Sequence, residues 1–231
     1  MSEAVLILGA TSAIARATAA AFAARGAALY LASRDQDELR RSAADLRLRH
    51  GVEVHYGVFD AEATQTHAAF LQTVLEEMPE LSGVVLAFGY LGDAQAARDF
   101  QLGAKIIASN FTGAASILSH CAHYFEPLKR GFIIGISSVA GDRGRQSNYV
   151  YGAAKGALSL YLQGLRNRLF ASGVRVITIK PGFVDTAMTY GLPKLCLVAP
   201  AHDAGDRIVY TLDKSADVVY LPWFWRYIML I

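Results

Sequence analysis

The sequence has few cysteines and no apolar run long enough to cross a membrane. Its 231 residues include two cysteines, Cys121 and Cys196. Two cysteines so far apart form neither a disulfide framework nor a zinc site, and no other residues show metal-ligand spacing, so we expect no metal. This scarcity predicts a protein of the reducing cytoplasm. The apolar stretch 221–231 contains Pro222 and Arg226 and is far shorter than the roughly 20 residues of a transmembrane helix.

The sequence also lacks an excess of either charge. Twenty-two lysines and arginines balance 20 aspartates and glutamates, which gives a net charge of +2. The basic residues are dispersed apart from short pairs, whereas nucleic-acid-binding proteins gather them, so we expect no nucleic-acid partner. The first apolar run, Val5–Leu8, follows no basic segment and leads into a loop with a glycine, so we interpret it as a strand and not as a signal peptide.

Short apolar runs alternate with longer stretches of helical periodicity along the whole chain. With 53% hydrophobic residues, residues 1–231 are expected to form one domain with a single large core. The alternation is typical of a doubly wound, Rossmann-like α/β fold, a seven-stranded parallel sheet with helices on both faces. The predicted strands are Val5–Leu8, Ala28–Ala32, Val52–Phe59, Val84–Phe88, Phe132–Ile136, Val174–Ile179 and Val218–Leu221. The predicted helices are Ala13–Ala24, Asp35–Arg49, Glu62–Met78, Ala94–His120 and Ser147–Phe170.

Loops that follow the strands carry most of the unusual polar residues. Ligands of open parallel sheets bind outside the carboxyl ends of the strands, so a site is expected there. The segment 188–203, which two prolines and one glycine interrupt, is predicted to be a mobile substrate lid.

The first of these loops, residues 9–15, follows the first strand and opens a helix. Its backbone N–H groups and the helix dipole can receive a pyrophosphate. Only Gly9 in it is a glycine, and many α/β cores begin with such a turn and bind nothing, so this loop leaves phosphate binding open.

The end of the second strand indicates which dinucleotide would bind. An acidic residue there would accept the ribose hydroxyls of NAD, but this chain has Ser33 followed by Arg34. A 2′-phosphate would be attracted to that position, which predicts NADP(H) in preference to NAD(H). The alternative is that Arg34 is a solvated arginine at a helix entry.

Tyr151 and Lys155 lie one helical turn apart on one face of a predicted helix. A tyrosine titrates near pH 10 in water, and a fixed cation together with a positively charged nicotinamide ring would lower that pKa. The neighbouring Tyr149 has Ala153 at the same offset and is excluded. Taken alone, such a pair is more often a packing or surface pair than a catalytic one.

Two serines at the end of the fifth strand support a catalytic role for the tyrosine. Ser137 and Ser138 precede the loop that leads to the helix of Tyr151. The hydroxyl of Ser138 could hydrogen-bond a substrate oxygen opposite the phenol. Alternatively, both serines cap the end of the strand.

Together these residues resemble the short-chain dehydrogenase/reductase family, over essentially the whole chain. The matching landmarks are residues 9–15, Asp60, 86–89, Asn110, 136–141, 151–155 and 181–186. The resemblance implies an oxidoreductase that exchanges a hydride between a nicotinamide and a small-molecule alcohol or ketone substrate.

The resemblance also assigns roles to single residues. Tyr151 would be the general acid/base, Lys155 would lower its pKa and bind the nicotinamide ribose, Ser138 would orient the carbonyl, and Asn110 would hold a water in the proton relay. Asp60 would contact the adenine, and Gly89 would let the backbone run close to the adenine ribose. The implied cofactor contacts are Gly9, Thr11, Ser12, Ala13, Ile14, Ser33, Arg34, Asp60, Ala87, Gly89, Tyr151, Lys155, Pro181, Gly182, Val184 and Thr186.

Two positions depart from the family pattern. The second and third glycines of the phosphate loop are replaced by Ala13 and Ala15, so a pyrophosphate must tolerate methyl groups. The usual Asn-Asn-Ala-Gly after the fourth strand is Leu-Ala-Phe-Gly, which brings Phe88 near the site.

Within the family, residues 87–93, the loop 141–145 and the aromatic C-terminus are similar to reductases of the 2-keto position of polyprenyl-phosphoryl pentoses. This looser resemblance implies a phosphorylated or lipid-linked sugar and makes Arg143 and Arg145 candidate phosphate contacts. The alternative is a solvated basic loop beside an oligomer interface.

Further hypotheses concern activity and partners. A non-catalytic dinucleotide sensor on the same fold is the alternative function, although it would not need the Tyr/Lys/Ser/Asn set. The resemblance implies a homodimer or homotetramer. The aromatic cluster 223–227 leaves a peripheral membrane contact open, or it covers the end of the sheet or a partner subunit.

Overall fold

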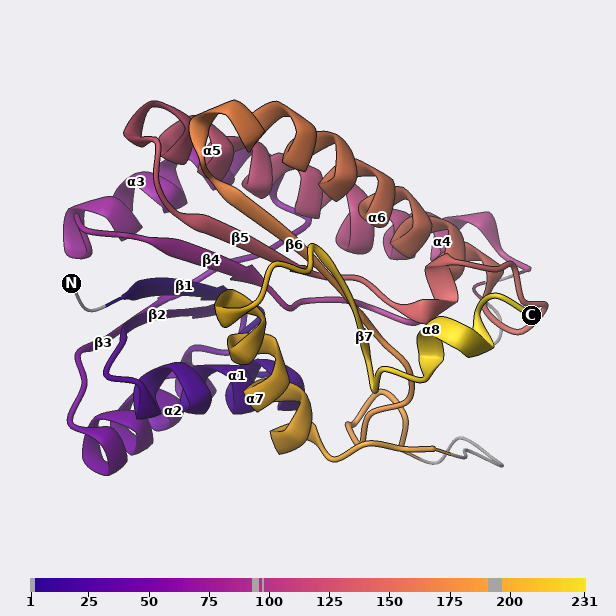
Figure 1. Ribbon diagram of the computed structural model, residues 1–231, viewed down its shortest axis with the longest axis horizontal. Helices are drawn as coiled ribbons and strands as arrows, with labels where there is room; N and C mark the ends of the chain where they lie inside the picture. The colour runs from indigo at the N-terminus through magenta and orange to yellow at the C-terminus, as the bar shows by residue number, and fades with distance from the viewer. Residues whose placement is uncertain (1–2, 93–95, 97, 191–196) are drawn as a thin grey trace.

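One seven-stranded parallel sheet runs through the computed structural model, which describes residues 3–92, 96, 98–190 and 197–231 (Figure 1). The strand order is β3-β2-β1-β4-β5-β6-β7, which confirms the predicted fold class. The strands are β1 (Ala4–Leu8), β2 (Ala28–Ser33), β3 (Val54–Val58), β4 (Gly83–Leu86), β5 (Phe132–Ile136), β6 (Arg175–Pro181) and β7 (Val218–Leu221). All seven predicted runs form strands: Phe132–Ile136 and Val218–Leu221 match at both ends, and the ends of the others differ by at most two residues.

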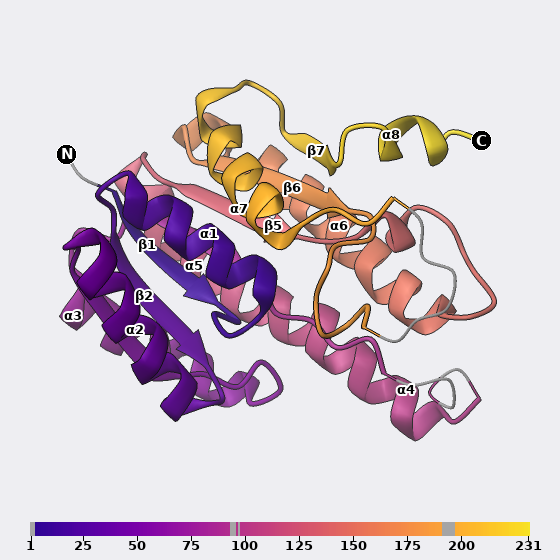
Figure 2. The same cartoon turned by 90° about the horizontal axis from the view of Figure 1, so that it is seen from below.

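Helices cover both faces of the sheet (Figures 1 and 2). On one face lie α1 (Ala13–Ala24), α2 (Gln36–His50) and α7 (Ala201–Tyr210). On the other lie α3 (His67–Glu77), α5 (Gly113–Leu128) and α6 (Tyr149–Leu169). The short helices α4 (Phe100–Ile107) and α8 (Trp225–Ile228) lie beyond the carboxyl edge of the sheet.

Alternation of side chains along the central strand β1 fills both layers of the core. Val5 and Ile7 pack among the residues beneath α1, α2 and α7, whereas Leu6 and Leu8 pack beneath α3, α5 and α6. Because successive side chains of a strand point to opposite faces, a strand covered on both sides needs apolar residues at every position. This explains the continuous apolar run at Val5–Leu8.

The two halves of the sheet diverge next to β1, which pairs with β2 on one side and β4 on the other. In an open parallel sheet this switch point leaves a crevice outside the carboxyl ends of the strands. The loops after β1, β2 and β4 therefore meet at one place, and the site is built there.

The predicted helix Ala94–His120 is wrong in extent and continuity. Residues 94, 95 and 97 lie outside the described part of the chain. Helix α4 begins after Asp99, whose side chain accepts a hydrogen bond from the backbone N–H of Gln101 at 2.8 Å. A π-helical segment, Ala108–Thr112, separates α4 from α5, and α5 runs on to Leu128. It continues past His120 because Cys121, Ala122 and Phe125 keep the helical spacing of buried residues.

One further helix starts later than predicted, and another was not predicted. A 3₁₀ turn at Thr64–Thr66 precedes α3, so the expected helix at Glu62 starts five residues later, at His67. Helix α7 was not predicted, and its first residues, 201–203, belong to the segment interpreted as a lid. Ala204, Ile208 and Val209 of α7 are buried against the sheet. Within the predicted lid, residues 191–196 lie outside the described chain, and Ala199 bridges to Val184.

Candidate active site

The loop between β1 and α1 lies at the switch point and has the geometry of a phosphate-binding turn. Gly9 has a positive φ of 83°, and a Cβ there would be 2.6 Å from the backbone nitrogen of Phe88, so only glycine fits. Ser12 caps α1 by accepting a hydrogen bond from the N–H of Ala15 at 3.2 Å. Ala13 lines the adjoining cleft and Ala15 is buried. A pyrophosphate bound at this loop would therefore lie close to the Ala13 methyl group but not to that of Ala15.

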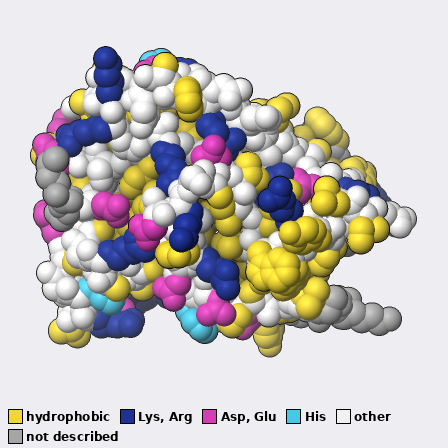
Figure 3. Space-filling model, viewed as in Figure 1, with side chains coloured by type: hydrophobic (Ala, Val, Ile, Leu, Met, Phe, Trp, Pro, Cys, Tyr) yellow, Lys and Arg dark blue, Asp and Glu magenta, His cyan; other side chains and the backbone are white. Residues whose placement is uncertain are grey.

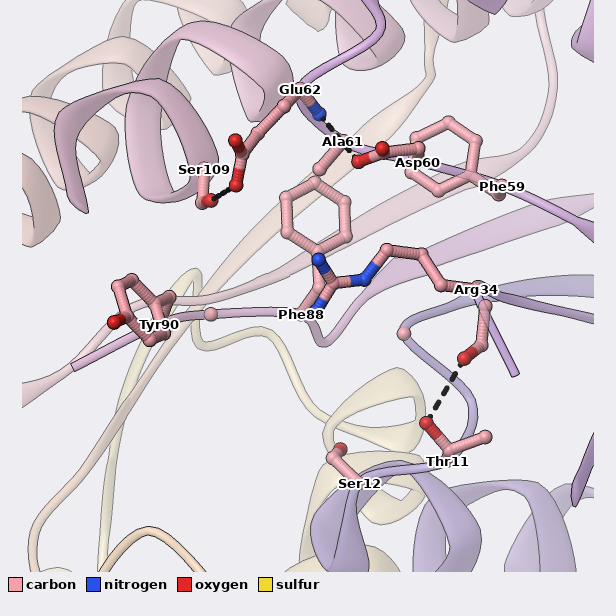
Figure 4. Close-up of a pocket in the computed structure, with 13 residues that line it drawn as sticks. Thr11, Ser12, Arg34, Phe59, Asp60, Ala61, Glu62, Phe88, Tyr90 and Ser109 are labelled. Atoms are coloured by element: carbon pink, nitrogen blue, oxygen red, sulfur yellow. Dashed lines mark hydrogen bonds between the residues drawn. The ribbon is translucent and has the colours of Figure 1, made fainter. Parts of the chain in front are cut away.

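A pocket of about 220 Å³ opens beside this loop, at the carboxyl ends of β2, β3 and β4 (Figure 4). Ser33 is buried and hydrogen-bonds Thr11 at 3.0 Å, while the exposed Arg34 extends across the pocket. The predicted residues in its lining are Gly9, Thr11, Ser12, Ser33, Arg34, Asp60 and Gly89. The lining also includes Phe59, Ala61, Glu62, Phe88, Tyr90 and Ser109. Apart from Phe88, these were not predicted, although most of them flank Asp60 or Gly89 in the sequence.

A buried histidine holds the loop of Asp60. The Nε2 of His67 donates to the Asp60 carbonyl at 3.0 Å, so its Nδ1 accepts from the Ser116 hydroxyl at 3.0 Å in the neutral ring. The ring also stacks on Phe59 with centroids 4.8 Å apart. Burial lowers the pKa of His67, which favours this neutral form. No pattern in the sequence indicates His67, because its role depends on the packing of α3 against α5.

A second cleft, of about 500 Å³, adjoins the first and shares Thr11, Ser12, Phe88 and Gly89 with it. Tyr151 and Lys155 line it from α6, and Ser138 lines it from the end of β5. The other predicted residues in the lining are Ala13, Ile14, Ala87, Pro181, Gly182, Val184 and Thr186. The lining also includes Arg16, Ile136, Ser137, Ala187, Met188 and Thr189, which were not predicted as site residues. The fold thus brings every predicted site residue except Asn110 into the linings of two adjoining cavities.

Tyr151, Lys155 and Ser138 are held close together. Tyr151 is 8% exposed and Lys155 is 3% exposed. The Lys155 ammonium donates to the Ile136 carbonyl at 3.0 Å and lies 5.9 Å from the centroid of the Tyr151 ring. A hydrogen bond joins the side chains of Tyr151 and Ser138.

Burial sets the protonation of this group. It raises the pKa of Tyr151 to about 12, a shift that the hydrogen bond with Ser138 opposes. It lowers the pKa of Lys155 to about 8. The expected lowering of the phenol pKa is therefore not seen in the chain alone, because desolvation disfavours both charged forms. A lowered value needs further positive charge in the cleft.

Asn110 lies behind the cleft, in the π-helical segment, and is buried. Its side-chain amide donates to the carbonyls of Tyr90 and Ile106 at 2.7 and 2.8 Å and accepts from the N–H of Tyr90 at 3.2 Å. A Cβ on Gly89 would lie 2.9 Å from the Asn110 Oδ1 and 3.3 Å from the Lys155 Nζ. Asn110 thus fixes the loop after β4 against the end of α4, and its role in a water relay stays a prediction.

Arg143 and Arg145 contact the C-terminal segment. The Nε of Arg143 donates to the Met229 carbonyl at 3.2 Å, and Arg145 contacts the Met229 sulfur at 3.8 Å. Neither side chain belongs to the lining of the two cavities. Arg16, which does, pairs with Glu38 and donates from Nε to the Thr11 carbonyl at 3.2 Å.

The described residues contain no group of three or more His, Cys, Asp or Glu side chains that could hold a metal ion. None of the helices formed by these residues has both the length and the apolar character needed to cross a membrane.

Comparison with known proteins decides the family. Residues 3–194 match the family model of the short chain dehydrogenases. The chain belongs to the short-chain dehydrogenase/reductase family. Members of this family are oxidoreductases that act on alcohols and ketones, and this chain is such an enzyme.

Curated relatives match nearly the whole chain. An uncharacterized oxidoreductase of Mycobacterium tuberculosis is 35% identical over 223 residues, which cover 96% of this chain and 89% of that protein. Sulfoacetaldehyde reductase 2 of Chromohalobacter salexigens is 32% identical over 237 residues, which cover 94% and 91%.

Solved structures show the same fold. A short-chain dehydrogenase from Sphingobium yanoikuyae in complex with NADPH has a TM-score of 0.87 and 27% identity, and the match covers 95% of this chain and 88% of that one. NAD+-bound xylitol dehydrogenase has a TM-score of 0.86 and 19% identity, with coverage of 95% and 97%. At that identity, the second likeness shows the fold alone.

Proposed function

We propose that this short-chain dehydrogenase/reductase transfers a hydride between NADP(H) and the carbinol or carbonyl carbon of a secondary alcohol or ketone. The observation that carries the proposal is the meeting of Tyr151, Lys155 and Ser138 in one cleft with the loop 181–186. When bound, the cofactor supplies or accepts the hydride. The glycine at position 9 and the cavities on either side of its loop fit a dinucleotide.

The protein residues would control the proton. During reduction, the hydroxyl of Ser138 donates a hydrogen bond to the substrate oxygen, and the phenol of Tyr151 gives that oxygen its proton. Burial keeps the proton on Tyr151 until negative charge develops on the substrate. The ammonium of Lys155, held by the Ile136 carbonyl, then stabilises the tyrosinate. During oxidation the tyrosinate takes the proton from the alcohol.

Arg34 supports the preference for NADP(H). It extends from the end of β2 across the pocket that would hold the adenosine, and the neighbouring Ser33 carries no charge that would repel a 2′-phosphate. The Sphingobium yanoikuyae relative was solved with NADPH, which agrees with this proposal.

Replacement of Arg34 tests this preference. We expect Arg34→Ala to raise the Kd for NADPH about tenfold or more, because it removes a charge-assisted hydrogen bond, and to leave the Kd for NADH unchanged. Fluorescence titration of both cofactors measures the two constants. Arg40→Ala, on the exposed side of α2, is the matched control and should change neither value. Equal affinities of the unmutated enzyme for the two cofactors would contradict the proposal.

The character of the cleft favours a neutral, largely apolar substrate. Ile136, Val184, Ala187 and Met188 line it, and Arg16 and Lys155 are the charged side chains among the described residues of that lining. A phosphorylated or lipid-linked sugar, which the looser family resemblance implies, would need Arg143 and Arg145. Both contact Met229 instead, so this substrate class is the second candidate.

A panel of ketones and keto-sugars, including phosphorylated ones, tests the proposed activity by the loss of NADPH absorbance. Oxidation of NADPH by any member supports an oxidoreductase, and the most rapidly reduced class identifies the substrate. Tight NADPH binding without turnover on any compound would instead favour a non-catalytic dinucleotide sensor.

We also propose a homodimer or homotetramer that works in the cytoplasm and associates through α5 and α6. Leu160 on α6 is exposed in the single chain, and burial of such a residue against a symmetry mate would favour association. We expect light scattering at micromolar concentration to give a dimer or tetramer, and Leu160→Glu to shift it toward monomer. Leu48→Glu, on the exposed face of α2, is the control. A monomeric parent protein would refute the prediction.

A further inference from the structure

The C-terminal segment after β7 carries two tryptophans in opposite environments. Trp223 is 63% exposed, whereas Trp225 is 4% exposed. Hydrophobic side chains gather on the surface over α8 (Figure 3). The exposed hydrophobic residues of this segment are Trp223, Tyr227, Ile228, Leu230 and Ile231. Trp225 points inward, so it is not part of this exposed surface and must have another role.

The indole ring of Trp225 packs under the loop that follows β6. A Cβ on Gly182 would overlap the indole Nε1 and Cε2 atoms, so the ring lies directly against the backbone of this residue. Phe183 makes an edge-to-face contact with the ring at a centroid distance of 5.5 Å. Gly182 also lines the catalytic cleft, and therefore Trp225 supports one wall of that cleft from behind.

The buried cluster that contains this ring extends to the other side of the site. Trp225 and Met229 form a buried cluster with Val139, the residue after Ser138. Arg143, from the loop after Val139, donates to the Met229 carbonyl and fixes the segment from that side. This cluster, with Trp225 in it, thus lies between the backbone next to Ser138 and the loop 181–186, whose Phe183 packs against it.

A backbone hydrogen bond and an unpaired donor lie where the loop meets this segment. The N–H of Gly182 donates to the Leu221 carbonyl at 2.8 Å, which ties the loop to the strand before α8. The Nε1 of Trp225 is buried and has no hydrogen-bond partner among the described residues. Buried donors are normally paired, so this unpaired N–H is an unusual feature of the segment.

We propose that Trp225 is a positioning residue, which sets the distance between the loop 181–186 and Ser138 and so fixes the nicotinamide end of the cofactor against the proton-transfer groups. This inference rests on the proposed function. Truncation of the ring would let the loop sink toward α8, and a displacement of about 1 Å in a reacting centre can lower the rate about a hundredfold.

The first experiment compares Trp225→Val with Trp223→Val, which removes the same side chain from the exposed side of the segment. For Trp225→Val we expect the Kd for NADPH to rise about tenfold and kcat to fall, because the nicotinamide is misplaced. The Kd for 2′,5′-ADP should change by less than about twofold, because this ligand carries only the adenosine half that the first pocket receives. Trp223→Val should change none of these values.

A second pair of variants tests the same contact from the loop and guards against a simple loss of folding. Gly182→Ala places a methyl group against the indole and should weaken NADPH binding and turnover. Adding Trp225→Val to it should restore part of both, because the smaller side chain leaves room for the methyl group. A melting temperature for each variant shows whether the fold is retained.

The outcomes separate this inference from the proposed function. A parent protein that binds neither NADPH nor NADH would refute both. If the parent binds and reduces substrate but Trp225→Val weakens NADPH and 2′,5′-ADP equally, Trp225 is only a structural residue and the inference is wrong. The inference also fails if Trp225→Val does not improve Gly182→Ala.

Discussion

Replacement of Tyr151 by phenylalanine is expected to abolish most turnover and to leave the protein otherwise intact. The ring stays in its buried position on α6, and the change removes a single oxygen, the partner of the Ser138 side chain. A general acid/base contributes about 10²–10⁴-fold to a rate, so kcat should fall by that factor. The Kd for NADPH should change little, because the ring stays in place and only one oxygen is lost.

The matched control for this prediction is Tyr149→Phe, two residues earlier and exposed on the same helix. It should retain parent activity, because Tyr149 lies outside the lining of the cleft. Steady-state kinetics on the best ketone of the panel measure both variants. Near-normal turnover of Tyr151→Phe would show that the catalytic assignment is wrong, however well the cofactor binds.

Lys155→Met is expected to damage the enzyme in two ways. Methionine keeps the length of the side chain but cannot donate to the Ile136 carbonyl or stabilise a tyrosinate. We expect kcat to fall by about 10²-fold or more and the Kd for NADPH to rise. The pH–rate profile separates this variant from Tyr151→Phe: loss of the cation raises the phenol pKa further, so the alkaline limb of any residual alcohol oxidation should move to higher pH.

Lys155→Met should reduce activity but should not reduce stability at pH 7. Burial lowers the pKa of Lys155 from 10.5 to about 8, so between these two pH values the unfolded chain binds more protons than the folded chain. The free energy of unfolding of the parent should therefore rise with pH across this window, by roughly 3 kcal/mol from this group. Lys155→Met should lack that rise, and at pH 7 it should be no less stable than the parent. Thermal melts at pH 7 and pH 10 test this, and a large drop in melting temperature at pH 7 would contradict it.

The candidate site was predictable to the extent that its residues lie next to strand ends. Gly9, Arg34, Gly89 and Ser138 each follow a strand, and the carboxyl ends of parallel strands must meet at one edge of the sheet. Residues that reach the site through packing gave no such signal. His67 depends on the contact of α3 with α5, and Trp225 depends on where the chain turns after β7.

The errors in the helices have a related cause. The apolar spacing of residues 100–128 is helical throughout, so it does not reveal the π-helical segment Ala108–Thr112 that turns Asn110 toward Tyr90. Helix α7 is short, and its sequence is irregular near its start. Its apolar residues are buried because the sheet lies beneath them, which the local sequence does not show.

The sequence by itself determined the alternation of strands and helices, and with it the parallel sheet and the edge at which ligands bind. It also determined the pairing of Tyr151 with Lys155, because four residues along a helix place two side chains on one face. Only the tertiary structure decided the protonation of that pair, since desolvation depends on how deeply α6 is buried against β6 and the neighbouring helices α4 and α5. It likewise decided that Arg143 and Arg145 contact Met229 and that Trp225 supports Gly182, because these contacts join segments about 40 to 90 residues apart, and such distances are closed by the packing of the whole core.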